Sequence, residues 1–104
     1  MNVLGTDYKI IIDSEYCISE GADGFCQRYE KRIYMREVQD MLEKNASSQA
    51  KQKRFNEVLR HELIHAFLFE AGLDEYGCDE TIVQWIASKI PQIINCFNEL
   101  KCAE

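Results

Sequence analysis

The sequence predicts an α+β domain in which a small N-terminal antiparallel β-sheet packs on a central helix and a C-terminal helix. Three patterns carry this prediction. β-Branched and alternating residues gather before residue 37, an apolar helical segment follows from about residue 50, and isoleucines recur at three- and four-residue spacing after residue 79. At 104 residues the chain suits one hydrophobic core, so we expect a single domain over residues 1–104.

Three strands are expected in the N-terminal third. The segment Tyr8–Asp13 is rich in isoleucine and too short for a helix, which indicates a strand. The stretches Phe25–Tyr29 and Arg32–Arg36 alternate partly in polarity, so they are expected to pair as a hairpin that turns at Glu30 and Lys31. Together these segments would form the small sheet.

The rest of the chain is expected to be helical. A short helix is predicted around Val38–Leu42, and a long one from about Ala50 to Ala71 with Gly72 as its C-terminal cap. Asp79 is expected to cap a last helix, which Pro91 should kink or divide. The apolar positions of this last helix are Ile82, Ile86, Ile90, Ile93, Phe97 and Leu100.

Composition and charge exclude several classes of protein. The net charge of −6 argues against general affinity for nucleic acid or for an anionic membrane. The longest apolar run near the N-terminus, Ile10–Ile12, is too short for a signal peptide or a membrane span, so we expect a cytoplasmic protein. Five cysteines without a Cys-x-x-Cys pair fit a reducing compartment better than a disulfide framework.

Both histidines of the chain fall in one five-residue run, His61-Glu62-Leu63-Ile64-His65. Residues four apart share a helix face, so the two imidazoles can bind one metal ion. Glu62 lies next to the first histidine and can reach a water on that ion without being a ligand itself. The pattern therefore predicts a Zn²⁺ site with His61 and His65 as ligands and Glu62 as the general base of a hydrolase.

A catalytic zinc ion needs a third protein ligand, and no histidine remains. Glu80 is favoured because it opens the last helix on the same face as the small residue Ala87. Asp79 is the alternative, although it suits an N-cap, and Cys78 is a weaker one. Polar residues of the long helix gather in one stripe, which would line a cleft: Arg54, Glu57, His61, Glu62 and His65.

The residues from Val58 to Phe67, followed by Glu80, Val83, Ile86 and Ala87, resemble the gluzincin-type zincins. The resemblance is strongest to the ImmA/IrrE-like and SprT-like metallopeptidase domains and to small His-Glu-x-x-His proteins carried by phages and prophages. It covers Val58 to Pro91. It implies a zincin-like fold, a zinc metallopeptidase, and Glu80 as the third ligand.

These observations predict hydrolysis of a peptide or protein substrate by a metal-activated water. Tyr76 is a candidate second donor to the oxyanion, and Arg32–Arg36 is a candidate sheet edge for strand addition by the substrate. The alternative is a non-catalytic zinc-binding regulatory or interaction module of phage or prophage origin. The substrate sequence and the oligomeric state stay open.

Overall fold

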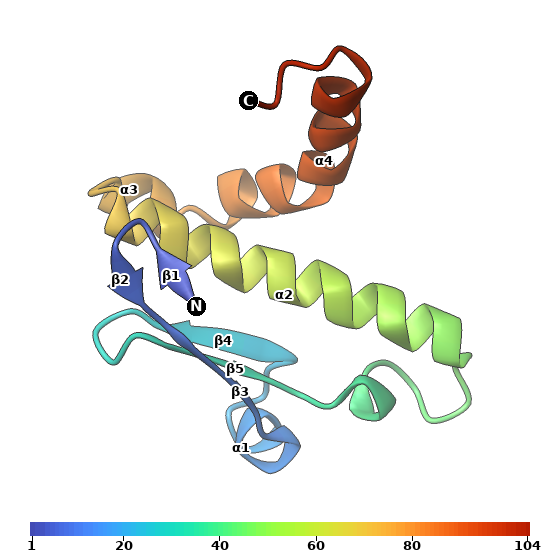
Figure 1. Ribbon diagram of the computed structural model, residues 1–104. Coiled ribbons are helices and arrows are strands. Elements are labelled where there is room, and N and C mark those ends of the chain that lie inside the picture. Colours follow the sequence, from blue (N-terminus) through green and yellow to red (C-terminus); the bar gives the residue numbers. More distant parts are fainter.

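A computed structural model describes all residues from Met1 to Glu104 and has the expected α+β character. The long helix α2 lies between the sheet on one side and helices α3 and α4 on the other, and α1 lies on the far side of the sheet (Figure 1). In chain order the elements are β1 (Asn2–Val3), β2 (Thr6–Asp7), β3 (Lys9–Ile12), α1 (Ser14–Ser19), β4 (Gly24–Gln27), β5 (Arg32–Met35), the 3₁₀ turn η1 (Val38–Asp40), α2 (Ser48–Glu70), α3 (Asp74–Gly77) and α4 (Glu80–Glu99).

The main sheet is mixed, so the expectation of an antiparallel sheet is wrong in part. Its strand order is β3-β5-β4. The predicted hairpin is confirmed, because β4 and β5 pair antiparallel with Phe25 opposite Tyr34, but β3 pairs parallel to β5 with Ile10 opposite Ile33. The reason is α1, which Asp13 caps directly after β3 and which carries the chain to the outer position of β4. The central position is then filled by β5.

A separate antiparallel pair, β1 and β2, was not predicted from the sequence. Its two-residue turn has positive φ at Leu4 (49°) and Gly5 (93°), the conformation that favours a tight hairpin. Val3 of this pair joins the hydrophobic core together with Tyr8. The pair therefore extends the core over the C-terminal end of α2.

The core lies between the sheet and α2. Its buried side chains are Val3, Tyr8, Ile33, Met35, Met41, Val58 and Ala66. Gly24 lets β4 approach α2 closely, because a Cβ at this position would lie 2.7 Å from Met35 Sδ and 2.9 Å from Val58 Cγ1. The first residue of β4 is thereby held against the helix that carries both histidines.

Helix α2 begins two residues before the predicted start, Ala50, and ends one residue before the predicted end, Ala71. The Ser47 hydroxyl accepts from the Ala50 amide at the N-terminus. At the C-terminus Gly72 has a φ of 77°, and the amides of Gly72 and Leu73 donate to the carbonyls of Phe69 and Leu68. The predicted glycine cap is confirmed, whereas the short helix expected at Val38–Leu42 is only the 3₁₀ turn η1.

Helix α4 changes direction midway, and its C-terminal half projects away from α2 (Figure 1). Pro91 lies inside this helix and has no amide to donate to the Ala87 carbonyl. Arg60 of α2 satisfies that carbonyl, since its Nε donates to Ala87 O at 2.8 Å. The first half of α4 is thus fastened to α2 at the point where the helix bends.

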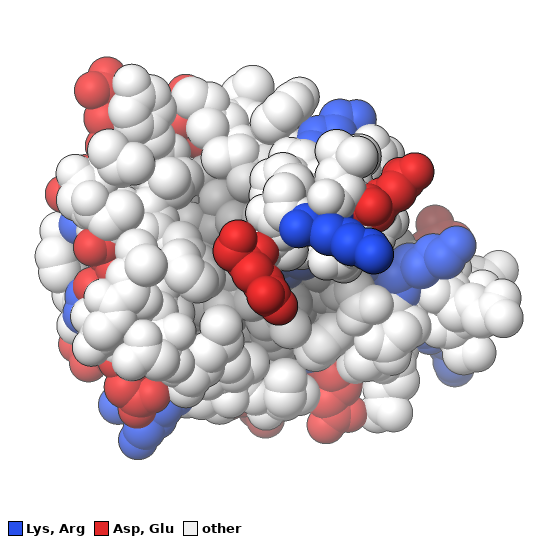
Figure 2. All heavy atoms as spheres, turned by 45° about the horizontal axis from the view of Figure 1, so that its top comes forward, with Lys and Arg blue, Asp and Glu red and all other residues white.

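No helix combines the length and apolarity needed to cross a bilayer. On the face drawn in Figure 2 the acidic and basic side chains are scattered among uncharged residues around a hollow. That face carries no continuous basic surface.

Glu70, the last residue of α2, joins the N-terminal strands to the helix. Its carboxylate accepts from the Tyr8 hydroxyl at 2.7 Å and the Thr6 hydroxyl at 3.0 Å, and it forms an ion pair with Lys31. The hydrogen bonds from Lys31 and Tyr8 lower the pKa of Glu70 to about 2 from its ordinary 4.5. This carboxylate therefore stabilises the folded state above pH 4.5, and its contribution is lost as the pH falls toward 2.

Replacing Glu70 with Gln is expected to lower the melting temperature at pH 7, because the charge that Lys31 and Tyr8 bind is removed. The difference from the wild type should shrink below pH 4.5 and vanish near pH 2, where Glu70 itself is protonated. The difference in melting temperature is measured by thermal unfolding, followed by circular dichroism, at several pH values from about 2 to 7. Glu75→Gln, at an exposed α3 position, is the matched control and should melt like the wild type. A Glu70→Gln difference that stays constant with pH would contradict the assignment.

Candidate metal centre

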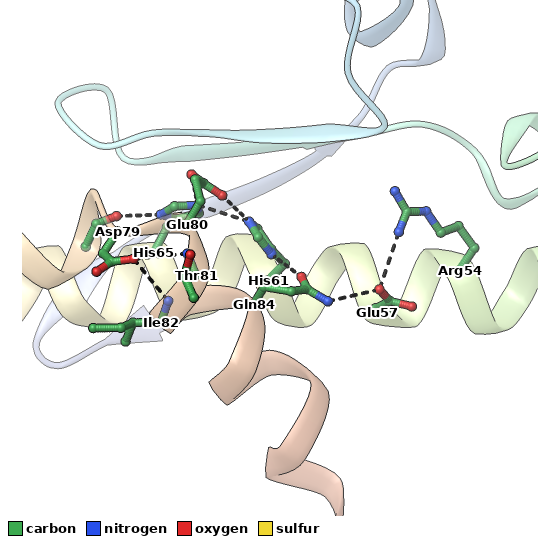
Figure 3. Close-up of polar contacts among 10 residues, drawn as sticks. Arg54, Glu57, His61, His65, Asp79, Glu80, Thr81, Ile82 and Gln84 are labelled. Carbon is green, nitrogen blue, oxygen red and sulfur yellow. Dashed lines mark hydrogen bonds and ion pairs between the residues drawn. The ribbon is translucent and has the colours of Figure 1, made fainter.

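Helix α2 presents His61 and His65 on one face, toward the start of α4 (Figure 3). They are four residues apart, and their Nε2 atoms lie 3.2 Å from each other. The His65 ring is buried against Phe69, with which it stacks at a centroid distance of 6.0 Å. The local cause is helical periodicity, which the sequence alone predicts.

The first turn of α4 adds Glu80 to this pair. Glu80 Oε2 lies 2.9 Å from His61 Nε2, and Glu80 Oε1 lies 3.0 Å from His65 Nε2. The neighbouring Asp79 is used as the N-cap, since its Oδ1 accepts from the amides of Thr81 and Ile82. The structure thus brings together the three predicted ligands, His61, His65 and Glu80, and gives Asp79 the alternative role.

The other ring nitrogen of each histidine is held by an oxygen. His65 Nδ1 lies 2.7 Å from the carbonyl oxygen of Gly77, and His61 Nδ1 lies 2.7 Å from Gln84 Oε1. A carbonyl or amide oxygen can only accept, so each Nδ1 carries the proton when the ring is neutral. Both Nε2 atoms then direct a lone pair at Glu80.

This donor set fits a divalent cation. The two Nε2 atoms lie 3.2 Å apart, and each lies 2.9 to 3.0 Å from a different oxygen of Glu80. Neutral rings in this arrangement would repel the carboxylate unless a positive charge lies between them. Ligands on a tetrahedral zinc ion, at bond lengths of about 2.0 to 2.1 Å, are separated from each other by about 3.3 Å. Two imidazoles and one carboxylate suit Zn²⁺, and the 69% exposure of the Glu80 side chain leaves one side open to solvent.

Glu62 lies beside this cluster and is not one of its three donors. Its side chain is buried, with 7% exposure. Burial raises the pKa of Glu62 to about 7, and the negative charge of Glu80 adds to this rise, whereas His61 and the Cys26 amide lower it. A carboxylate with a pKa near neutrality can take up and release a proton at the pH of most cells.

The cluster opens into a groove bounded by β4, α2 and the start of α4. Residues lining this groove are Gly24, Phe25, Cys26, His61, Glu62, His65, Phe69, Gly77, Cys78 and Glu80. Tyr76 is not among them and is half exposed, so nothing in the geometry supports it as an oxyanion donor. Cys78 lines the groove without joining the three donors.

The sheet edge at the groove is β4 and not the segment Arg32–Arg36. Because β5 is the central strand of the sheet, its backbone groups are paired with β3 and β4. The expectation that Arg32–Arg36 offers an edge for a peptide is therefore wrong. The free edge beside the histidines belongs to Gly24–Gln27.

The sequence placed Glu57 in the polar stripe but did not reveal that Gln84 and Glu57 orient the His61 ring. Gln84 lies one turn after Glu80 and Glu57 one turn before His61, and the Gln84 Nε2 donates to Glu57 Oε1 at 3.2 Å. Both residues share a helix face with a predicted ligand, so the four-residue spacing was the available signal. The Gly77 carbonyl carries no such signal, because its position depends on the path of α3.

The chain was compared with protein-family models, curated proteins and solved structures, and none of the three comparisons finds a match.

Proposed function

We propose that the protein is a zinc-dependent metallopeptidase with a zincin-like arrangement, in which His61, His65 and Glu80 hold the metal and Glu62 is the general base. The observation that supports this proposal most is that the Nε2 atoms of His61 and His65 meet the Glu80 carboxylate, with the buried Glu62 beside them. Carboxylates as buried as that of Glu62 are unusual, and they occur where chemistry needs a tuned pKa.

Bound zinc would polarise a substrate carbonyl and lower the pKa of a water molecule. Glu62 accepts a proton from the attacking water, a role that its position in the groove beside the three donors allows. It then returns the proton to the amine that leaves. The Gly77 carbonyl and Gln84 keep the His65 and His61 rings in the orientation that ligation requires.

A peptide substrate can pair with the free edge of β4. Strand addition supplies backbone hydrogen bonds and leaves side chains alternating in direction, so an extended peptide there would pass along the groove. Phe25 and Cys26 of β4 and Phe69 of α2 give this groove an apolar part beside the metal ligands. An unfolded or loop segment of a protein suits such an edge better than a helix does.

A second candidate function is a non-catalytic module in which zinc only fastens α4 to α2. It is favoured by the small core, since 14 of the 104 residues are buried, and a metal staple is a common aid to small domains. Glu80 is the residue through which such a staple would act. The two functions differ in what Glu62 does.

Glu80→Ala should weaken zinc binding by at least about 100-fold, because removal of a ligand costs more than the 10- to 100-fold typical of the groups that support ligands. Asp79→Ala removes an N-cap worth about 1 kcal/mol and should change the zinc affinity only a few-fold. Competition with a chromogenic chelator measures both. Equal losses in the two variants would contradict the assignment of Glu80.

Glu62→Gln separates the two functions. The variant should bind zinc as the wild type does, whereas peptide cleavage should fall by about 100-fold or more, the usual contribution of a general base. Cleavage of a library of extended peptides, read by mass spectrometry with zinc present, measures the rate. Undiminished cleavage by Glu62→Gln would rule out its role as base, and a zinc-loaded wild type that cleaves nothing would favour the staple.

A further inference from the structure

A series of polar contacts runs from Arg54 through Glu57 and Gln84 to His61 (Figure 3). Arg54 Nε and Nη2 donate to Asp23 Oδ2 at 3.1 and 2.8 Å, and Arg54 Nη1 lies 3.4 Å from Glu57 Oε1. Glu57 in turn accepts from Gln84 Nε2, and Gln84 Oε1 faces His61 Nδ1. These contacts join Asp23, directly before β4, to residues of α2 and α4 and end at the His61 ring.

The charge of Glu57 fixes which way the Gln84 amide points. A carboxylate only accepts hydrogen bonds, so the amide must turn its NH₂ group toward Glu57. The opposite orientation would place Gln84 Oε1 against a negatively charged oxygen. With the NH₂ group held by Glu57, only the amide oxygen is left for His61.

That oxygen in turn decides where the His61 ring carries its proton. An acceptor 2.7 Å from Nδ1 requires a hydrogen on Nδ1, which leaves Nε2 free to act as a ligand. A reversed amide would present N–H to Nδ1 and would favour a proton on Nε2. A protonated Nε2 is unable to bind a metal.

We propose that Glu57 sets the ring tautomer of His61 through Gln84, so that Glu57 and Gln84 are positioning residues for the first ligand. Arg54, anchored by Asp23, holds the carboxylate of Glu57 in place. Neither Glu57 nor Gln84 is one of the three donors. The claim that this tautomer matters for metal binding rests on the proposed function. The claim that Glu57 and Gln84 set the tautomer does not.

His65 provides an internal comparison. Its Nδ1 bonds to a backbone carbonyl, that of Gly77, which has a fixed polarity and is buried. Its tautomer therefore does not depend on any side-chain amide. The protein has two histidines. The His61 ring therefore reports on the contacts with Gln84 and Glu57, and the His65 ring shows whether a substitution has disturbed the structure in general.

The test uses the full chain in its metal-free form at about pH 8.5 in a Glu80→Ala background, because the Glu80 carboxylate, 2.9 Å from His61 Nε2 and 3.0 Å from His65 Nε2, would otherwise favour a proton on each Nε2. Long-range ¹H–¹⁵N correlation spectra report the tautomer of each histidine. In this background, with Glu57 and Gln84 intact, both rings should carry the proton on Nδ1. In Gln84→Leu and Glu57→Leu the His61 nitrogens should shift toward a mixture of tautomers while those of His65 stay unchanged.

Glu57→Gln keeps the shape of the side chain and removes only its charge, so it should give a smaller shift of His61 in the same direction. The matched controls are Gln92→Leu and Glu99→Leu, at exposed positions of α4. The two control variants, made in the same background, should leave the tautomers of His61 and His65 unchanged. A His61 ring that keeps its proton on Nδ1 in both Glu57→Leu and Gln84→Leu would overturn the proposal.

Zinc affinity gives a separate measurement. Gln84→Leu should weaken zinc binding by about 10-fold, the lower end of the range for groups that support a ligand, and the two controls should not change it. If the wild type bound no zinc, the proposed function would fail, while the tautomer of His61 would still decide whether Glu57 acts through Gln84.

Discussion

The meeting of two imidazole lone pairs with the Glu80 carboxylate is the interaction on which the rest of the structure depends. The two Nε2 atoms lie 3.2 Å apart, and each lies 2.9 to 3.0 Å from one of the two Glu80 oxygens. Such an arrangement is stable only with positive charge at its centre. A bound metal ion would supply that charge without placing a proton on either Nε2.

The surrounding fold can be understood as the support for this arrangement. Helix α2 places polar side chains on one line of a surface that otherwise packs on the sheet. Helix α4 contributes both a ligand and Gln84, and Arg60 fastens it to α2 at the carbonyl that Pro91 leaves free. The connection through α3 brings the Gly77 carbonyl to His65. Each of these contacts restricts the motion of a side chain that would bind the metal, so less conformational entropy would be lost on metal binding.

The parts of the candidate site that depend on local spacing were predictable from the sequence. A separation of four residues placed His61 and His65 on one face, the preference of aspartate for N-caps separated Asp79 from Glu80, and glycine at position 72 ended α2. Pro91 bent α4 for the same kind of local reason. In every case the cause lies within one or two helical turns.

Features that depend on contacts between distant segments were not predictable. The parallel pairing of β3 with β5 follows from α1 directing the chain past the central position, and alternation of polarity carries no information about strand order. For the same reason the free edge was assigned to Arg32–Arg36 when it belongs to β4. Glu57 was predicted only as part of the polar stripe of α2 and Gln84 was not singled out, because their contact depends on the crossing of α2 and α4.

The central claim is most directly tested by a crystal structure of the protein purified without chelators, with anomalous scattering data collected on both sides of the zinc absorption edge. The account predicts one zinc peak per chain, bound by Nε2 of His61, Nε2 of His65 and the carboxylate of Glu80, with Glu62 outside the ligand set. A structure without a metal at this position after incubation with zinc, or with a metal bound through other residues, would contradict it.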